Sequence, residues 1–268
     1  TDITVLKMRV SSTSYSMLSM DKNSIDRFTD RVVDYEKFRP NYPKEIIQVL
    51  KEQIGLHKKW LVADIGSGTG LSTQLFLENG NDVFAVEPNR EMRESLLHHF
   101  KTYRNLIAVN ATAEDTTIES GCVDLIFAGQ SFHWFDRQAC RKEFDRILTE
   151  NGHMVIVWNQ RDPTDAFQQE YEHFLRSHIP SYQPVSHKNI SDNDLKHFFG
   201  TRAMKKITLP NQQILDLRSF LGRVRSSSYF PKEQYKNKTL YDDLRILFDK
   251  YAIFDRIVFK YITEIYIS

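Results

Sequence analysis

The chain has 268 residues, of which 41% are hydrophobic and 26% charged, and this length and balance suit one elaborated α/β domain or a domain with a small cap. Its 36 basic and 35 acidic side chains leave a net charge of +1, which provides no field for wrapping nucleic acid. No apolar run is long enough to span a bilayer, so we expect neither a nucleic acid nor a membrane as partner.

The beginning of the chain predicts a leader followed by helices. Residues 1–23 are rich in Ser, Thr and Met without periodicity, which indicates a loose leader before a single domain at 24–268. Residues 24–58 are expected to form two lid helices, with apolar side chains at helical spacing in the first. The first helix should stop before Pro40, because proline disfavours continuation, and Pro43 suits the first turn of the second helix.

Between residues 60 and 160 strand and helix patterns alternate, which predicts a mostly parallel sheet covered by helices on both faces. In such sheets ligands bind beyond the carboxyl ends of the strands, next to the first strand, so we expect this stretch to be the cofactor-binding core. The predicted strands are 61–65, 82–86, 106–109, 123–128 and 153–158. The predicted helices are 71–78, 90–101 and 137–148.

Beyond residue 160 this rhythm breaks, and we expect helical or loop-rich cap segments at 161–202 and 210–255. Apolar and polar residues alternate in the last stretch, which predicts a final strand at 258–268 that pairs with a strand near residue 205 in a terminal antiparallel addition to the sheet. The other predicted elements are helices at 165–177, 212–221 and 232–251, a loop-rich insertion at 179–199 and a strand at 203–209.

The run VADIGSGTG, residues 62–70, is the most informative motif. It predicts a buried strand that ends in an acidic residue, Asp64, and then a glycine turn. Without Cβ atoms, Gly66 and Gly68 permit positive φ and close approach of a ligand. The Gly-x-Gly-x-Gly spacing lacks the extra residue of the dinucleotide fingerprint, which favours S-adenosylmethionine over NAD. An ordinary tight turn between strand and helix is the alternative.

Glu87 ends the next predicted strand and favours a cofactor-binding loop over an ordinary tight turn. It stands 87 − 68 = 19 residues beyond the middle glycine, close to the spacing of the ribose-binding acid in nucleotide-binding sheets. A carboxylate there can accept hydrogen bonds from two ribose hydroxyls. Taken alone, Glu87 would be a solvated acid at a strand end.

Two further loops follow predicted strands at the same edge of the sheet. The stretch 110–115 is polar and can meet an adenine edge, although a surface turn is an equally good interpretation. The stretch 128–135, AGQSFHWF, brings Gln130 near a cofactor and projects His133 and Trp134 toward a transferable group. A His-Trp pair used for packing is the alternative.

With these residues in view, the chain resembles the class I S-adenosylmethionine-dependent methyltransferases, and within them the small-molecule, trans-aconitate methyltransferase-like branch. The resemblance covers roughly residues 24–160 and, more weakly, two C-terminal strings. The matching stretches are DYEKFRPNYP, VADIGSGTG, VFAVEPN, ATAEDT, VDLIFAGQSFHWFD, GHMVIVWN, SFLGRVRSSSYFP and FKYITEIYIS. It implies a Rossmann-like fold with a seven-stranded, mostly parallel sheet whose last strand is antiparallel.

The resemblance also implies contacts to S-adenosylmethionine and its product S-adenosylhomocysteine. The glycine loop would line the methionine end, Glu87 would hold the ribose, and two further pairs of residues would meet the adenine. One departure matters, because many relatives carry Asp where this chain has Thr112. The implied cofactor contacts are Tyr35, Asp64, Gly66, Ser67, Gly68, Glu87, Pro88, Met92, Ala113, Glu114 and Gln130.

We expect a methyltransferase that acts on a small-molecule acceptor through a carboxylate or hydroxyl oxygen. A carboxylate needs no general base, whereas a hydroxyl would need one, and His133 is the candidate. Arg39, which would also belong to the lid, and Arg161 can hold an anionic acceptor, although a surface cation is the more frequent role for Arg161. The expected acceptor contacts are Arg39, Tyr42, Trp134, Trp158 and Tyr229, with core packing as the alternative for Trp158.

Two other functions remain open at this point. An NAD(P)-linked oxidoreductase is disfavoured by the glycine spacing, and a noncatalytic cofactor-binding protein on the same fold would carry the same motifs. Cys122 and Cys140 indicate reduced thiols in a cytoplasmic protein and are too few for a cysteine zinc site, so no metal is expected.

Overall fold

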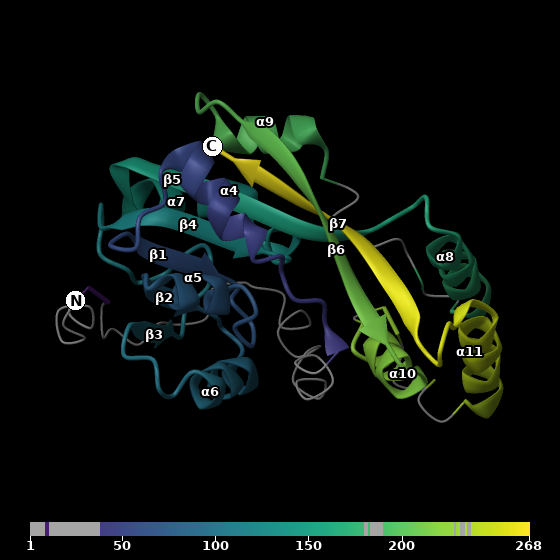
Figure 1. The fold of residues 1–268 in the computed structure, drawn as a ribbon. Helices are drawn as coiled ribbons and strands as arrows, with labels where there is room; N and C mark the ends of the chain where they lie inside the picture. The colour runs from purple at the N-terminus through teal and green to yellow at the C-terminus, as the bar shows by residue number, and fades with distance from the viewer. Residues whose placement is uncertain are drawn as a thin grey trace.

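In a computed structural model of the protein, the described residues fold around a seven-stranded sheet with the strand order β3-β2-β1-β4-β5-β7-β6 (Figure 1). The structure describes residues 9–10, 38–179, 182, 190–227, 229–230, 234 and 237–268. The strands are β1 Leu61–Ile65, β2 Asp82–Val86, β3 Leu106–Val109, β4 Val123–Gly129, β5 Leu148–Arg161, β6 Lys205–Leu215 and β7 Ile257–Ile267.

Strands β1 to β5 pair in parallel, and β7 lies antiparallel between β5 and β6. The chain order reverses direction across the sheet at β1, between β2 and β4, which makes the carboxyl end of β1 the switch point where ligands bind in such sheets. This confirms the predicted Rossmann-like, mostly parallel sheet with an antiparallel last strand.

Six of the described helices follow a residue whose polar side chain caps their free N–H groups. Asn89, Asp136 and Ser191 each accept a hydrogen bond from a backbone N–H in the first turn that follows. The helices are α4 Glu45–Ile54, α5 Thr73–Asn79, α6 Arg90–His99, the 3-10 turn η1 Phe132–Trp134, α7 Arg137–Ile147, α8 Ala166–His178, α9 Asp192–Phe199, α10 Leu217–Arg225 and α11 Lys238–Tyr251. Within the described ranges, no helix is both long and apolar enough to cross a bilayer.

The two faces of the sheet are buried against different helices. In β5, Val155 and Val157 face a cluster that includes α4, α5 and α6, whereas Ile156 and Trp158 face a second cluster that includes α7 and α9. This alternation follows from the two-residue period of a strand and buries both faces, as expected for a parallel sheet.

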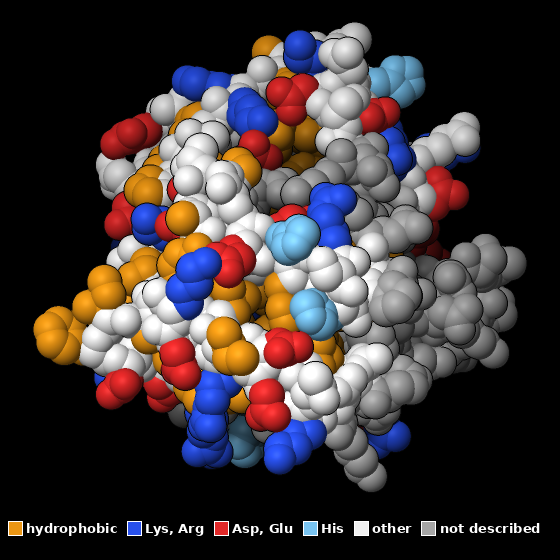
Figure 2. All heavy atoms as spheres, turned by 90° about the vertical axis from the view of Figure 1, so that its right-hand side faces the viewer, with side chains coloured by type: hydrophobic (Ala, Val, Ile, Leu, Met, Phe, Trp, Pro, Cys, Tyr) orange, Lys and Arg blue, Asp and Glu red, His pale blue; other side chains and the backbone are white. Residues whose placement is uncertain are grey.

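A third cluster lies at the far end of the molecule, where β6 and β7 extend beyond the parallel strands (Figure 1). Helices α8, α10 and α11 pack there around aromatic side chains. The ring centroids of Phe167 and Tyr171 each lie 5.8 Å from that of Phe220 and 5.6 Å from that of Phe259. Figure 2 views this end and shows apolar side chains at the surface among charges of both signs.

Three local predictions differ from the structure. Residues 212–215 were expected to begin a helix, but they continue β6, because each of them pairs with β7 between Ile257 and Lys260. The stretch 179–199 was expected to be loop-rich, yet Ser191 and Asp194 form a reciprocal capping box that starts α9. Strand β5 also runs to Arg161, beyond the predicted end at 158, because β7 supplies hydrogen bonds to its outer part.

Most of the predicted leader and the first lid helix lie outside the described residues. Within the leader only residues 9–10 are described, and Val10 forms an antiparallel bridge with Ile118. Tyr35, an implied cofactor contact, belongs to the part that is not described.

We predict that Phe259→Ala lowers the free energy of unfolding by about 3–5 kcal/mol, because it removes a ring that is 1% exposed at the centre of the third cluster. Phe254→Ala is the matched control, since that ring is 94% exposed and its loss should change stability by less than about 0.5 kcal/mol. Urea denaturation of both variants measures the difference. Equal losses in the two variants would contradict a packed third cluster.

Candidate functional site

One pocket opens at the carboxyl ends of β1 and β4, where the outer part of β5 and the residues of α10 and β7 close its far side. Its position next to β1 agrees with the switch point of the sheet. Its lining residues are Arg39, Pro40, Tyr42, Gly66, Ser67, Gly68, Thr69, Leu71, Ser72, Gly129, Gln130, His133, Trp134, Asn159, Gln160, Arg161, Arg223, Tyr229 and Tyr261.

The glycine loop after β1 forms the floor of this pocket. Gly66 and Gly68 have φ values of 68° and 57°, a region that favours glycine. A Cβ added at Gly66 would lie 2.6 Å from the Cβ of Ser131, so the close approach of the loops after β1 and β4 requires glycine there. The Ser131 hydroxyl also donates to the carbonyl oxygen of Ile65 at 2.7 Å, which ties the two loops together.

Asp64 ends β1 with a fully buried carboxylate. It accepts hydrogen bonds from the hydroxyls of Ser72 and Thr73, at 2.8 Å and 2.6 Å, just before and at the first residue of α5. Burial raises the pKa of the Asp64 carboxyl from 3.8 to about 6, despite these hydrogen bonds. Asp64 therefore fixes the start of α5 beneath the loop and does not itself line the pocket.

Glu87 directly follows β2, and its carboxylate contacts the glycine loop. One oxygen accepts from the backbone N–H of Gly68 at 2.9 Å and the other from the N–H of Asn89 at 2.8 Å. Burial raises the pKa of Glu87, although these two amides and the positive charge of Arg93 oppose it. Each carboxylate oxygen still has a lone pair to offer, so Glu87 can accept from a ligand while it holds the loop.

The glycine loop carries two hydroxyl groups that a ligand in the pocket can hydrogen-bond. The side-chain oxygens of Ser67 and Thr69 are buried, line the pocket and have no hydrogen-bond partner among the described residues. A buried hydroxyl without a partner costs free energy, so its presence beside a ligand pocket indicates that the ligand completes the hydrogen bond. A Cβ added at Gly68 would meet nothing closer than the sulfur of Met92, at 3.7 Å, which leaves room above the loop.

The residues expected around the adenine lie in two different places. Met92 and Ala113 are buried, with Met92 in the first turn of α6 close to Gly68, and Pro88 is half-buried. The Glu114 carboxylate accepts from the backbone N–H of Asp136 at 2.9 Å, beside the start of α7. Like Pro88, Met92 and Ala113, Glu114 is not among the residues that line the pocket.

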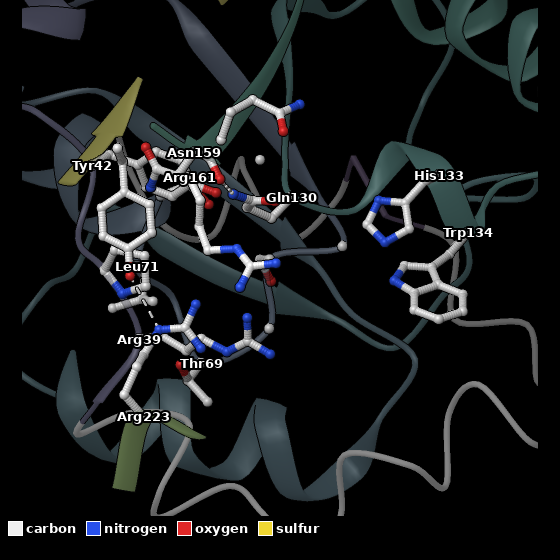
Figure 3. A pocket seen from close by; sticks show the side chains of 18 of the residues that line it. Arg39, Tyr42, Thr69, Leu71, Gln130, His133, Trp134, Asn159, Arg161 and Arg223 are labelled. Carbon is white, nitrogen blue, oxygen red and sulfur yellow. Dashed lines mark hydrogen bonds between the residues drawn. The ribbon is translucent and has the colours of Figure 1, made fainter. Parts of the chain in front are cut away.

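The loop after β4 supplies the wall opposite the glycine loop. Gln130 has a φ of 57° and donates from its side-chain amide to the carbonyl oxygen of Asn159 at 3.2 Å. Gly129 leaves space for Tyr42, because a Cβ there would lie 2.4 Å from the Tyr42 hydroxyl. His133 and Trp134, from η1, lie on one side of the pocket with ring centroids 4.9 Å apart (Figure 3).

Three arginines enter the pocket on the side away from His133 (Figure 3). The sequence predicted Arg39 and Arg161 for an anionic acceptor but missed Arg223, which comes from α10. Tyr229 lines the same side, as expected. Arg223 carried no signal in the sequence, since a basic residue in an amphipathic helix normally faces solvent.

Trp158 does not belong to this wall. It is 2% exposed and packs in the sheet core, with ring centroids 6.2 Å from Phe132 and 5.7 Å from Tyr266. The residues of β5 that line the pocket are Asn159, Gln160 and Arg161, which follow Trp158 at the end of the strand. Core packing is the correct interpretation of this residue.

Comparisons with known proteins show which proteins the domain is similar to. Residues 63–156 match the family described as "Methyltransferase domain". Relatives include an uncharacterised methyltransferase of Schizosaccharomyces pombe, 31% identical over 50% of this chain and 53% of its own length, and one of Mycobacterium tuberculosis, 35% identical over the same shares. The chain thus spans about half the length of these curated relatives.

The fold also matches solved structures. A protein of Anaeromyxobacter dehalogenans, provisionally named a type II methyltransferase, superposes with a TM-score of 0.62 at 21% identity, over 86% of this chain and 95% of its own. Residues 63–156 therefore match a methyltransferase domain family, and the described part of the chain shares the fold of this solved structure.

We predict that Asp64→Asn changes how stability depends on pH. The folded-state pKa of Asp64 lies above its ordinary value, so the unfolded chain ionises first, and wild-type stability relative to Asp64→Asn should fall as the pH rises from about 4 to about 6. A shift of about two units corresponds to about 3 kcal/mol. Urea denaturation at pH 4, 5, 6 and 7 measures the difference, and a constant difference across this range would show that the carboxyl ionises normally.

Proposed function

We propose that this protein is an S-adenosylmethionine-dependent methyltransferase that acts on a small-molecule acceptor, at a carboxylate or hydroxyl oxygen. One observation carries the proposal. The glycine loop at the switch point presents two buried hydroxyls, on Ser67 and Thr69, that have no hydrogen-bond partner among the described residues, and the backbone N–H of Gly68 between them donates to the Glu87 carboxylate. These polar groups supply the kind of chemistry that a nucleoside with an amino-acid tail requires.

The residues of the cradle fit that cofactor. The Ser67 and Thr69 hydroxyls would bind the amino-acid end, and the spare lone pairs of Glu87 would accept from the ribose hydroxyls. Met92 and Ala113 would provide the apolar surface for the adenine. Asp64 supports the cradle from below through Ser72 and Thr73. When bound, S-adenosylmethionine supplies a methyl group already activated by its positively charged sulfur.

The protein's part in the reaction is to place the acceptor in line with that methyl group. The acceptor oxygen uses a lone pair to form the new bond to the methyl carbon, as the carbon–sulfur bond breaks and its electron pair stays on sulfur. Alignment of this kind can supply roughly 7–11 kcal/mol of the barrier. A carboxylate acceptor releases no proton, whereas a hydroxyl must lose one, and His133 is the residue of the pocket wall placed to accept it.

The pocket supports a small acceptor. Residues from the chain before β1, from the end of β5, from α10 and from β7 line it together with the glycine loop. The net charge of +1 offers nothing for a nucleic-acid backbone. The arginines on the closed side suit an acidic molecule, in keeping with the trans-aconitate methyltransferase-like branch that the sequence resembles.

The cofactor proposal predicts that S-adenosylhomocysteine binds the wild-type protein and that Glu87→Ala weakens this binding by about 10- to 100-fold. The reason is the loss of charged hydrogen bonds worth about 1.5–3 kcal/mol. Isothermal titration calorimetry measures both affinities. Glu94→Ala is the matched control, because Glu94 lies in α6 nearby but only forms an exposed ion pair with Arg90.

Absence of S-adenosylhomocysteine binding to the wild-type protein would reject the proposal. Equal affinities for wild type and Glu87→Ala would show that Glu87 does not bind the ribose. Transfer of a labelled methyl group to a panel of small acids and alcohols then tests catalysis. Tight cofactor binding without transfer to any acceptor would instead favour a noncatalytic protein on the same fold.

A further inference from the structure

The closed side of the pocket carries more positive than negative charge. Arg39, Arg161 and Arg223 line it, and no Asp or Glu is found among the described residues of the lining. Figure 3 shows their guanidinium groups gathered in the same part of the pocket, to one side of His133 and Trp134. Arg223 is buried and the side chain of Arg161 is 15% exposed, so neither is a typical surface cation.

Arg161 is held in place, but only some of its hydrogen-bond donors have partners among the described residues. One terminal nitrogen, Nη2, donates to Glu172 at 2.5 Å and to the hydroxyl of Tyr182 at 2.7 Å, and the guanidinium lies over the ring of Tyr171. The other terminal nitrogen, Nη1, is buried and has no hydrogen-bond partner among the described residues. This donor belongs to a residue of the pocket lining, so a ligand in the pocket can reach it.

Arg223 is held only by neutral groups. It is 6% exposed, donates to the hydroxyls of Tyr261 at 3.2 Å and Ser227 at 2.8 Å, and stacks over Phe259. Among the described residues, no carboxylate forms an ion pair with it. A phenol or a serine hydroxyl orients a guanidinium but does not neutralise its charge.

The charge balance of this pair favours one carboxylate as ligand. Arg161 and Arg223 bring two positive charges, and Glu172, the carboxylate that pairs with Arg161, also pairs with Arg176, so at least one of the two positive charges is uncompensated. A buried charge without a counter-ion is strongly unfavourable. A singly charged carboxylate completes the balance, and the guanidinium groups provide the hydrogen-bond donors that a carboxylate accepts.

We propose that Arg161 and Arg223 bind a carboxylate of the acceptor that anchors it and is not itself methylated. The inference rests on the proposed methyltransferase function. The anchoring role follows because a carboxylate whose lone pairs accept from two guanidinium groups is a poor nucleophile. The acceptor therefore carries this anchor and a second, reactive oxygen that lies toward the glycine loop and His133.

The anchor is assigned to the acceptor and not to the cofactor's own carboxylate. The cradle for the cofactor lies within residues 63–156, the stretch that matches the methyltransferase family, whereas Arg161 and Arg223 both lie outside that stretch. They come from the end of β5 and from α10, and they line the pocket together with the glycine loop.

Tyr229 provides an independent readout of this site. Its hydroxyl lies 3.3 Å from that of Tyr171. The described groups around it are Arg161, Arg223, Ser227 and the tyrosines Tyr171, Tyr182 and Tyr261. Burial would raise the pKa of Tyr229, but the two arginines outweigh burial and lower it. A carboxylate bound between the arginines cancels their effect, so the pKa of Tyr229 should rise and tyrosinate absorbance at alkaline pH should fall.

Titration calorimetry with two probes tests the proposal. Citrate tests the anchor, and S-adenosylhomocysteine tests the cofactor site. We expect citrate to bind the wild-type protein and to bind at least tenfold more weakly to Arg161→Gln and to Arg223→Gln, with S-adenosylhomocysteine affinity unchanged. Arg218→Gln is the matched control, because Arg218 lies on the exposed face of the same helix as Arg223. Arg223→Lys should recover part of the citrate affinity.

The two probes separate the possible failures. A tenfold loss of S-adenosylhomocysteine affinity in both arginine variants would assign the site to the cofactor's carboxylate and overturn the proposal. So would a wild-type protein that binds S-adenosylhomocysteine but neither citrate nor succinate, or one that binds inorganic phosphate more tightly than citrate. A wild-type protein that binds citrate through the arginines but not S-adenosylhomocysteine would reject the methyltransferase function and leave the carboxylate site standing.

The tyrosinate signal keeps the test independent of variant folding. In the wild-type protein at alkaline pH, citrate should lower tyrosinate absorbance, and Tyr229→Phe should lose that response. An unchanged absorbance on saturation with citrate would show that the carboxylate binds away from the two arginines.

Discussion

The contact between the Glu87 carboxylate and the backbone N–H of Gly68 organises the cofactor side of this molecule. It joins the end of β2 to the loop after β1 at 2.9 Å. A loop with several residues at positive φ has few internal hydrogen bonds, so it keeps one shape only if neighbouring strands supply partners. Glu87 supplies one and Ser131 of the loop after β4 fixes the other side through Ile65. The carboxyl ends of three adjacent strands thereby share one rigid floor.

The closed side of the pocket depends on a different constraint. Strands β6 and β7 are long enough to pass beyond the parallel strands, and helices α8, α10 and α11 cover this extension with an aromatic cluster. That cluster holds Arg223 and Tyr261 against the end of β5. The pocket therefore has one wall built by the parallel sheet and another built by the antiparallel addition. A substitution in the aromatic cluster can alter acceptor binding without touching the glycine loop.

Local patterns were sufficient to predict the first wall. The strands at 61–65, 82–86 and 106–109 agree with the structure, because each is a short apolar run bounded by polar or glycine residues. The positions of Asp64 and Glu87 at strand ends followed directly. The surroundings of Glu114 and Trp158 were not readable in the same way. Glu114 accepts a hydrogen bond from the backbone N–H of Asp136 just before α7, and Trp158 packs in the core one residue before the part of β5 that lines the pocket.

The second wall could not be predicted because its elements gain their form from partners far away in the sequence. Gln212–Leu215 have a helical apolar spacing, yet pairing with β7 makes them a strand. Arg223 is drawn inward by Tyr261, 38 residues further along the chain, and Arg161 by Glu172 and Tyr182. Such cations are stable inside a protein only when something negative joins them. The charge balance from which we infer the chemistry of the acceptor therefore arises only in the folded chain, and no window of the sequence contains it.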